Sequence, residues 1–157
     1  MTQASYWCEL AWLGGDGVDE GVMVEVDEGW IVSIESEVAT PPAAAARLDG
    51  LTIPGLANAH SHAFQRALRG RTHAARGDFW SWRDAMYGLA AELDPDRYLA
   101  LARATYAEMA LAGITCVGEF HYLHHAPGGT RYADSNEMGR AMIEAAAEAG
   151  KIGRAHV

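Results

Sequence analysis

Hydrophobic and polar residues alternate along the first third of the chain with the period of two that is typical of β-strands. Asp27-Glu28-Gly29 interrupts the alternation and predicts a hairpin turn. Pro41-Pro42 and the alanines after it resemble a linker. We therefore predict β-structure for residues 1–50. The alternating positions are Tyr6, Cys8, Leu10 and Trp12, then Val22, Val24 and Val26, then Trp30, Val32 and Ile34.

The pattern changes after residue 50. Leu51-Thr52-Ile53 opens a predicted strand that runs to His60 and His62. Hydrophobic residues then recur at helical spacing, first at Phe64 and Leu68. Residues 70–77 are predicted to form a basic, irregular loop, and a second helical stretch follows the aromatic segment 79–83.

Two further helices are predicted from their first residues. Asp94-Pro95 provides a capping carboxylate and then a proline at the first helical position. Asp134, with Glu137 three residues later, resembles a capping box and predicts an alanine-rich helix up to Gly150. Between these helices, Ile114 to Tyr122 is predicted to be a buried strand.

Strands and helices thus alternate over residues 51–150, which predicts an α/β fold with a parallel sheet. Two strands are too few to bury both faces of such a sheet, so we expect an incomplete domain from the front part of a longer protein. Residues 151–157 resemble the translation of a sequencing-library adapter. We interpret them as a non-native tail in which His156 has no function.

Composition narrows the function further. The chain has 157 residues, half of them hydrophobic, with no apolar run as long as a membrane span and no secretory signal. Its net charge of −9 disfavours nucleic acid. Cys8 and Cys116 lack metal-binding spacing and suit a reducing cytoplasm. We expect a cytoplasmic protein with a small-molecule substrate and no membrane partner, and the choice between monomer and homodimer stays open.

His60 and His62 are the strongest candidates for chemistry. Residues i and i+2 of a strand point to the same side, so both imidazoles can hold one metal ion. The alternative is a pair of histidines without a ligand. Their context favours metal, because they follow Pro54-Gly55 at a strand tip that opens a βα alternation. The pair therefore predicts a hydrolase that activates water on zinc or a similar metal.

The segment from Pro54 to His62 resembles the first-strand signature of the amidohydrolase superfamily. This resemblance implies a (β/α)8 TIM barrel with a metal centre at its mouth. Residues 51–150 would form its first βα units, and residues 1–50 the N-terminal strands of a small β-sandwich built from both chain ends. Segments 60–67, 79–83 and 119–125 further resemble the formimidoylglutamate deiminase family. Its members hydrolyse N-formimidoyl-L-glutamate to N-formyl-L-glutamate and ammonia in histidine degradation.

The same resemblance implies roles for individual residues. His60 and His62 match two zinc ligands, Gln65 a residue that contacts the substrate, and Arg83 and Tyr122 residues that hold its carboxylates. An arginine can pair with a carboxylate through two parallel hydrogen bonds, and a tyrosine hydroxyl adds a donor. The alternatives are that Arg83 stacks on a neighbouring tryptophan, that Tyr122 is a core residue and that Gln65 is solvated.

We assign no catalytic acid or base. Glu119 has no predicted role, His121 is interpreted as structural, and His124 and His125 as loop residues with at most adventitious metal affinity. The family's remaining ligands and its acid and base lie beyond residue 150, so we expect the chain alone to be inactive. Two alternatives stay open. One is another amidohydrolase, such as a guanine deaminase or a chlorohydrolase, and the other is an inert fragment that binds metal weakly.

Overall fold

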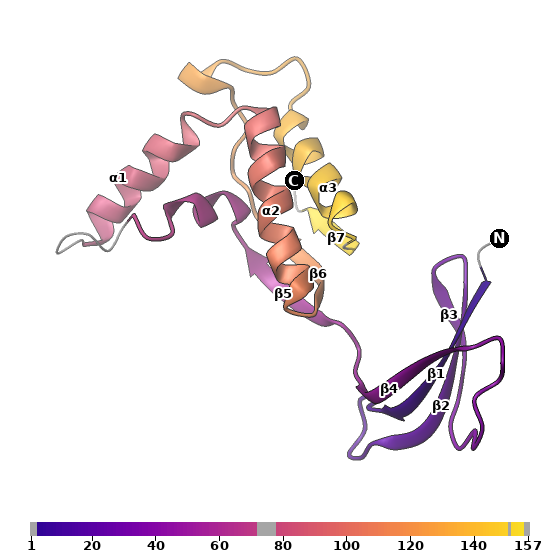
Figure 1. Cartoon of the computed structure of the whole chain (residues 1–157). Coiled ribbons are helices and arrows are strands. Elements are labelled where there is room, and N and C mark those ends of the chain that lie inside the picture. The colour runs from indigo at the N-terminus through magenta and orange to yellow at the C-terminus, as the bar shows by residue number, and fades with distance from the viewer. Residues whose placement is uncertain (1–2, 72–77, 151, 156–157) are drawn as a thin grey trace. The chain divides into compact units, whose positions relative to one another are not determined.

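The computed structural model describes residues 3–71, 78–150 and 152–155. They form two compact units, Met1–Pro54 and Gly55–Val157, each with its own sheet (Figure 1). The N-terminal sheet has the strand order β3-β2-β1-β4. Strands β1 to β3 are antiparallel neighbours, whereas β4 lies parallel to β1. The strands are β1 (Gln3–Ala11), β2 (Asp19–Asp27), β3 (Trp30–Glu35) and β4 (Ala46–Thr52).

The predicted hairpin is confirmed as β2 and β3. Asp27 pairs with Trp30, and the two residues between them, Glu28 and Gly29, have φ angles of 49° and 84°. Two positive φ angles are what a tight two-residue hairpin requires, because they match the twist of the flanking strands.

The predicted single strand from Leu51 to the histidines is wrong. Thr52 ends β4, where it pairs with Ala11 of the N-terminal sheet, and its carbonyl accepts a hydrogen bond from Trp12 at 2.9 Å. A separate strand starts at Leu56 in the second unit. The division therefore falls after Pro54, four residues beyond the predicted position. An apolar run shows that a strand is present but not which sheet it joins.

The second unit is an α/β arrangement around a parallel sheet of order β5-β6-β7, as the alternation predicts. Strand β7 lies in the segment interpreted as a non-native tail, and that origin stays a prediction. No helix in the described part of the chain has the length and apolar character needed to cross a membrane. The elements are β5 (Leu56–Ser61), η1 (Ala63–Leu68), α1 (Phe79–Ala90), α2 (Pro95–Leu111), β6 (Ile114–Glu119), η2 (Pro127–Gly129), α3 (Glu137–Glu148) and β7 (Ile152–Ala155).

Helices α2 and α3 pack side by side (Figure 1) and bury the core of this unit. The short 3-10 helix η1 contacts α2, so the segment after the histidine pair rests on the core. Strands β5 and β6 approach closely where Gly118 faces Ala59, since a Cβ at Gly118 would lie 2.7 Å from the Ala59 carbonyl oxygen. The largest fully buried side chains of the unit are Tyr98, Tyr106, Phe64, Met138, Met142, His121 and Val117.

The first residues of helices α2 and α3 confirm one prediction and contradict another. Asp94 caps α2 as predicted and accepts a hydrogen bond from the Arg97 amide at 2.8 Å. The predicted capping box at Asp134 is wrong, because Asn136 is the N-cap of α3. Asp134 instead accepts from the Asn136 amide and pairs with Arg140.

The predicted strand up to Tyr122 is also too long. Strand β6 ends at Glu119, and Tyr122 has a left-handed φ of 34°, so the residues after Glu119 do not follow strand alternation. Most of the predicted loop at 70–77, namely residues 72–77, lies outside the described residues.

Candidate metal centre

His60 and His62 come together at the end of β5 as predicted. Their Nε2 atoms are 3.0 Å apart, and their rings meet edge to face with centroids 4.6 Å apart. The strand geometry explains this approach, because residues two apart project to the same side. His60 is exposed and His62 is half-buried. The pair is therefore open to solvent and able to receive a ligand.

A main-chain carbonyl determines the tautomer of His62. Its Nδ1 lies 2.6 Å from the carbonyl oxygen of Phe120. A carbonyl can only accept, so Nδ1 carries the proton and the lone pair of Nε2 faces His60. A hydrogen bond from the distal ring nitrogen to a backbone carbonyl is the usual way in which proteins orient a metal-ligating histidine.

The donor set fits part of a zinc site. Two nitrogens bound tetrahedrally to one zinc ion at about 2.0–2.1 Å lie about 3.3 Å apart, close to the separation of this pair. Residues 3–71, 78–150 and 152–155 contain no group of three or more His, Cys, Asp or Glu side chains that could hold a metal ion. The two imidazoles thus provide two ligands, one fewer than the three that catalytic zinc sites draw from protein.

Gln65 and Tyr122, both predicted to bind substrate, contact each other. The Gln65 amide donates a hydrogen bond to the Tyr122 hydroxyl at 2.8 Å, and that hydroxyl donates to the sulfur of Met86 at 3.2 Å. Tyr122 also lies beside His62, with ring centroids 5.3 Å apart. The structure therefore places two polar groups from η1 and the β6 loop next to the histidine pair.

Arg83 does not join this cluster directly. Its guanidinium lies over the rings of Trp80 and Tyr87, 5.5 and 5.1 Å from their centroids. This is the stacking alternative recognised from the sequence. Arg83 lies three residues before Met86 on α1, hence on neighbouring positions of one helix face. In the structure its guanidinium is held by these two aromatic rings.

Two buried ionisable residues lie at and just after the end of β6. Glu119, the last residue of β6, is 3% exposed, and its Oε1 accepts a hydrogen bond from the Ala63 amide at 2.6 Å. His121 is buried, as its structural interpretation requires, and packs against the ring of His124. Burial, and then the nearby His124, lower the pKa of His121.

Sequence reasoning assigned Glu119 no role. Its position in the strand register would have indicated a place near the histidines. Glu119, the last residue of β6, pairs with Ser61, which lies between His60 and His62. The sequence alone does not give this register, because it does not show where β5 and β6 end.

With this geometry established, comparison with known proteins defines the class. The Amidohydrolase family model matches residues 51–154, so the chain belongs to the amidohydrolase family and its second unit is part of an α/β amidohydrolase domain. The predicted resemblance to formimidoylglutamate deiminase is confirmed. The chain is 40% identical to that enzyme from Pseudomonas aeruginosa, an alignment that covers 78% of this chain and 30% of the enzyme.

Two solved structures support the fold. An amidohydrolase from Brucella melitensis is 38% identical with a TM-score of 0.89, covering 97% of this chain and 34% of that one. A mutant of the atrazine chlorohydrolase TrzN from Arthrobacter aurescens, crystallised with zinc and atraton, is 24% identical with a TM-score of 0.75, covering 100% of this chain and 35% of that one. The chain thus spans about a third of the length of these relatives.

Proposed function

We propose that this chain forms the N-terminal part of a zinc-dependent formimidoylglutamate deiminase. In this proposal the full-length protein hydrolyses N-formimidoyl-L-glutamate to N-formyl-L-glutamate and ammonia as a step of histidine degradation. The observation that carries the proposal is the pairing of His60 and His62, with the ring of Tyr122 beside His62 and the Gln65 amide bonded to the Tyr122 hydroxyl. The 40% identity to the Pseudomonas enzyme supports the choice of substrate.

In this proposal, His60 and His62 are ligands of the metal ion. His62 already presents the Nε2 lone pair, because Phe120 keeps the proton on Nδ1. His60 must carry its proton on Nδ1 as well for its own Nε2 to ligate. Zinc, when bound, supplies a Lewis acid at which water becomes a better nucleophile near neutral pH.

Gln65 and Tyr122 bind the glutamate end of the substrate in this proposal. In the structure the Gln65 amide donates to the Tyr122 hydroxyl, and that hydroxyl donates to the Met86 sulfur, which is a weak acceptor. Both donors can therefore turn to a carboxylate oxygen. Arg83 supplies the positive charge once it leaves its aromatic rings, and a bidentate pair with a carboxylate is stronger than a cation–π contact at an exposed site.

The decisive experiment uses the full-length protein that contains this sequence, purified with zinc. We expect ammonia release from N-formimidoyl-L-glutamate, with no ammonia released from guanine and no chloride released from atrazine in parallel assays. His60→Ala should abolish the activity and the bound zinc. His124→Ala is the matched control, because His124 is an exposed histidine outside the pair, and it should retain both. A zinc-loaded protein that deaminates guanine but not formimidoylglutamate would establish the alternative amidohydrolase function instead.

A further inference from the structure

We infer that Glu119 is a positioning residue for the histidine pair, acting through the backbone of Ala63. This inference rests on the proposed role of His60 and His62 as metal ligands. Glu119 contacts neither ring in the structure. Its carboxylate accepts the amide hydrogen of Ala63, the residue immediately after His62, at 2.6 Å.

The hydrogen bond completes a three-point clamp between two segments. The Phe120 amide donates to the Ser61 carbonyl at 3.0 Å, and the Phe120 carbonyl accepts from His62 Nδ1 at 2.6 Å. Glu119 supplies the third point by holding Ala63. Because these contacts bracket His62 on both sides, the peptide that carries its ring is fixed relative to the carbonyl that orients it.

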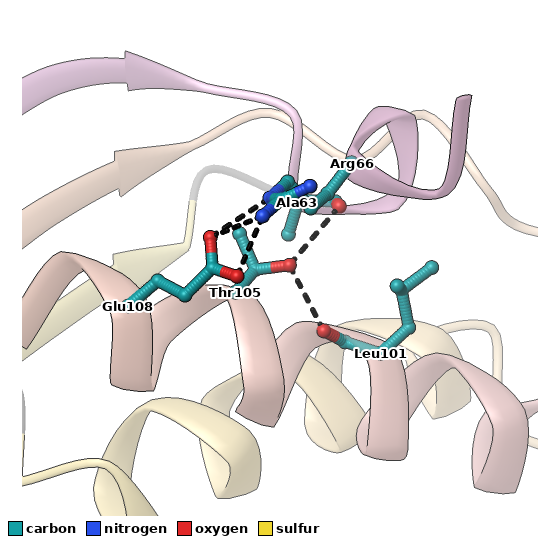
Figure 2. A network of polar contacts seen from close by, with 5 residues as sticks. All are labelled: Ala63, Arg66, Leu101, Thr105 and Glu108. Carbon is teal, nitrogen blue, oxygen red and sulfur yellow. Dashed lines mark hydrogen bonds and ion pairs between the residues drawn. The ribbon is translucent and has the colours of Figure 1, made fainter. Parts of the chain in front are cut away.

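A second hydrogen bond of the peptide between His62 and Ala63 is longer, since the His62 carbonyl accepts from the Gln65 amide at 3.0 Å. Figure 2 shows that the Thr105 hydroxyl lies near two carbonyls, 2.9 Å from Leu101 and 3.5 Å from Ala63. A hydroxyl has one proton, and the shorter distance assigns it to Leu101. The two-pronged pair of Arg66 with Glu108 anchors η1 to α2, but it starts three residues further along.

Burial of Ala63 makes this hydrogen bond necessary. Ala63 is 1% exposed, so its amide needs an acceptor, yet any neutral acceptor would serve. Glu119 places its carboxyl group in the interior near the buried hydroxyl of Tyr106, whose pKa is raised by burial and then by Glu119.

The test uses the 157-residue chain with 15N-labelled histidine, and Zn²⁺ alone as the probe. In Glu119→Ala we expect a smaller share of the Nδ1-protonated tautomer of His62 in long-range 15N–1H spectra. We also expect Zn²⁺ affinity to fall about tenfold or more, the usual cost of losing a residue that supports a metal ligand. Glu119→Gln keeps an acceptor oxygen and should restore most of both. Thr105→Val keeps the shape of the side chain and should change neither.

Hydrogen exchange at the Ala63 amide of the unsubstituted chain provides a readout that needs no variant, and we expect strong protection. Rapid exchange there, or an unchanged His62 tautomer in a folded Glu119→Ala chain, would overturn the inference. So would a Glu119→Gln chain as impaired as Glu119→Ala, because a hydrogen bond alone would then be insufficient. If the tautomer depends on Glu119 but the unsubstituted chain binds no Zn²⁺, the metal site fails while the positioning role stands.

Discussion

The rings of His62 and Tyr122 lie edge to face, with centroids 5.3 Å apart and an interplanar angle of 67°. This contact depends on the backbone of Tyr122, whose φ of 34° turns the chain out of the strand. A left-handed conformation costs a non-glycine residue roughly 1 kcal/mol or more and persists only where surrounding contacts enforce it. Here those contacts include the hydrogen bond from Gln65 to the Tyr122 hydroxyl.

Removing that hydroxyl tests its role in substrate binding. In the full-length protein, we expect Tyr122→Phe to raise the KM for N-formimidoyl-L-glutamate about tenfold, equivalent to the roughly 1.4 kcal/mol expected for one hydrogen bond to a charged group. Tyr132→Phe is a suitable control, because the buried hydroxyl of Tyr132 has no hydrogen-bond partner in the described part of the chain. Steady-state kinetics measures the KM of each variant. Equal KM values for the two variants would contradict a substrate contact by Tyr122.

Zinc should stabilise the 157-residue chain through the histidine pair. A ligand that binds only the folded state raises the free energy of unfolding by about 2.7 kcal/mol at one hundred times its Kd. We expect urea unfolding to show such an increase with Zn²⁺, and the chelator EDTA to reverse it. The double variant of His60→Ala and His62→Ala should lose the increase. Its matched control joins His124→Ala to His125→Ala, and a loss of stabilisation there would place the zinc elsewhere.

The N-cap of α2 provides a test of the fold that is independent of chemistry. Asp94→Ala leaves the Arg97 amide without its acceptor, and we expect the free energy of unfolding to fall by about 1 kcal/mol. Asp94→Asn preserves the side-chain oxygen and should cost much less. Urea denaturation of both variants measures the difference, and an equally large loss in Asp94→Asn would point to the charge rather than the hydrogen bond.

Acid should destabilise the chain through His121. Burial and His124 lower the pKa of His121 from its ordinary value of 6.5. The unfolded state then binds more protons than the folded state as pH falls below about 6.5, so the free energy of unfolding decreases there and is fully retained above it. We expect urea midpoints between pH 7 and pH 5 to fall less steeply in His121→Gln. An identical slope in both proteins would exclude this histidine as the cause.

Local patterns predicted the elements well where the responsible forces are local. The alternation around Val22 and Ile34 marks the hairpin because side chains on a strand alternate between faces. Asp94-Pro95 marks the start of α2 because both residues act on the first turn. The i, i+2 spacing likewise sufficed to bring His60 and His62 together.

The features that local sequence patterns failed to predict depend on contacts between residues far apart in the chain. Thr52 joins the first sheet by pairing with Ala11, forty-one residues earlier in the chain. Asp134 and Glu137 match the sequence pattern of a capping box, but the Asp134 side chain instead pairs with Arg140 and the Asn136 amide, and Asn136 is the N-cap. The importance of Glu119 depends on an amide fifty-six residues away, which no local spacing reveals.

The acceptor that orients His62 belongs to the main chain, and this has a consequence for variation at position 120. Every amino acid carries the same carbonyl, so exchanging the Phe120 side chain leaves the imidazole tautomer intact. Proline alone among the natural replacements also deletes the amide that donates to Ser61. The half-exposed side chain at position 120 can therefore change in size and polarity while the main-chain groups that orient His62 stay in place.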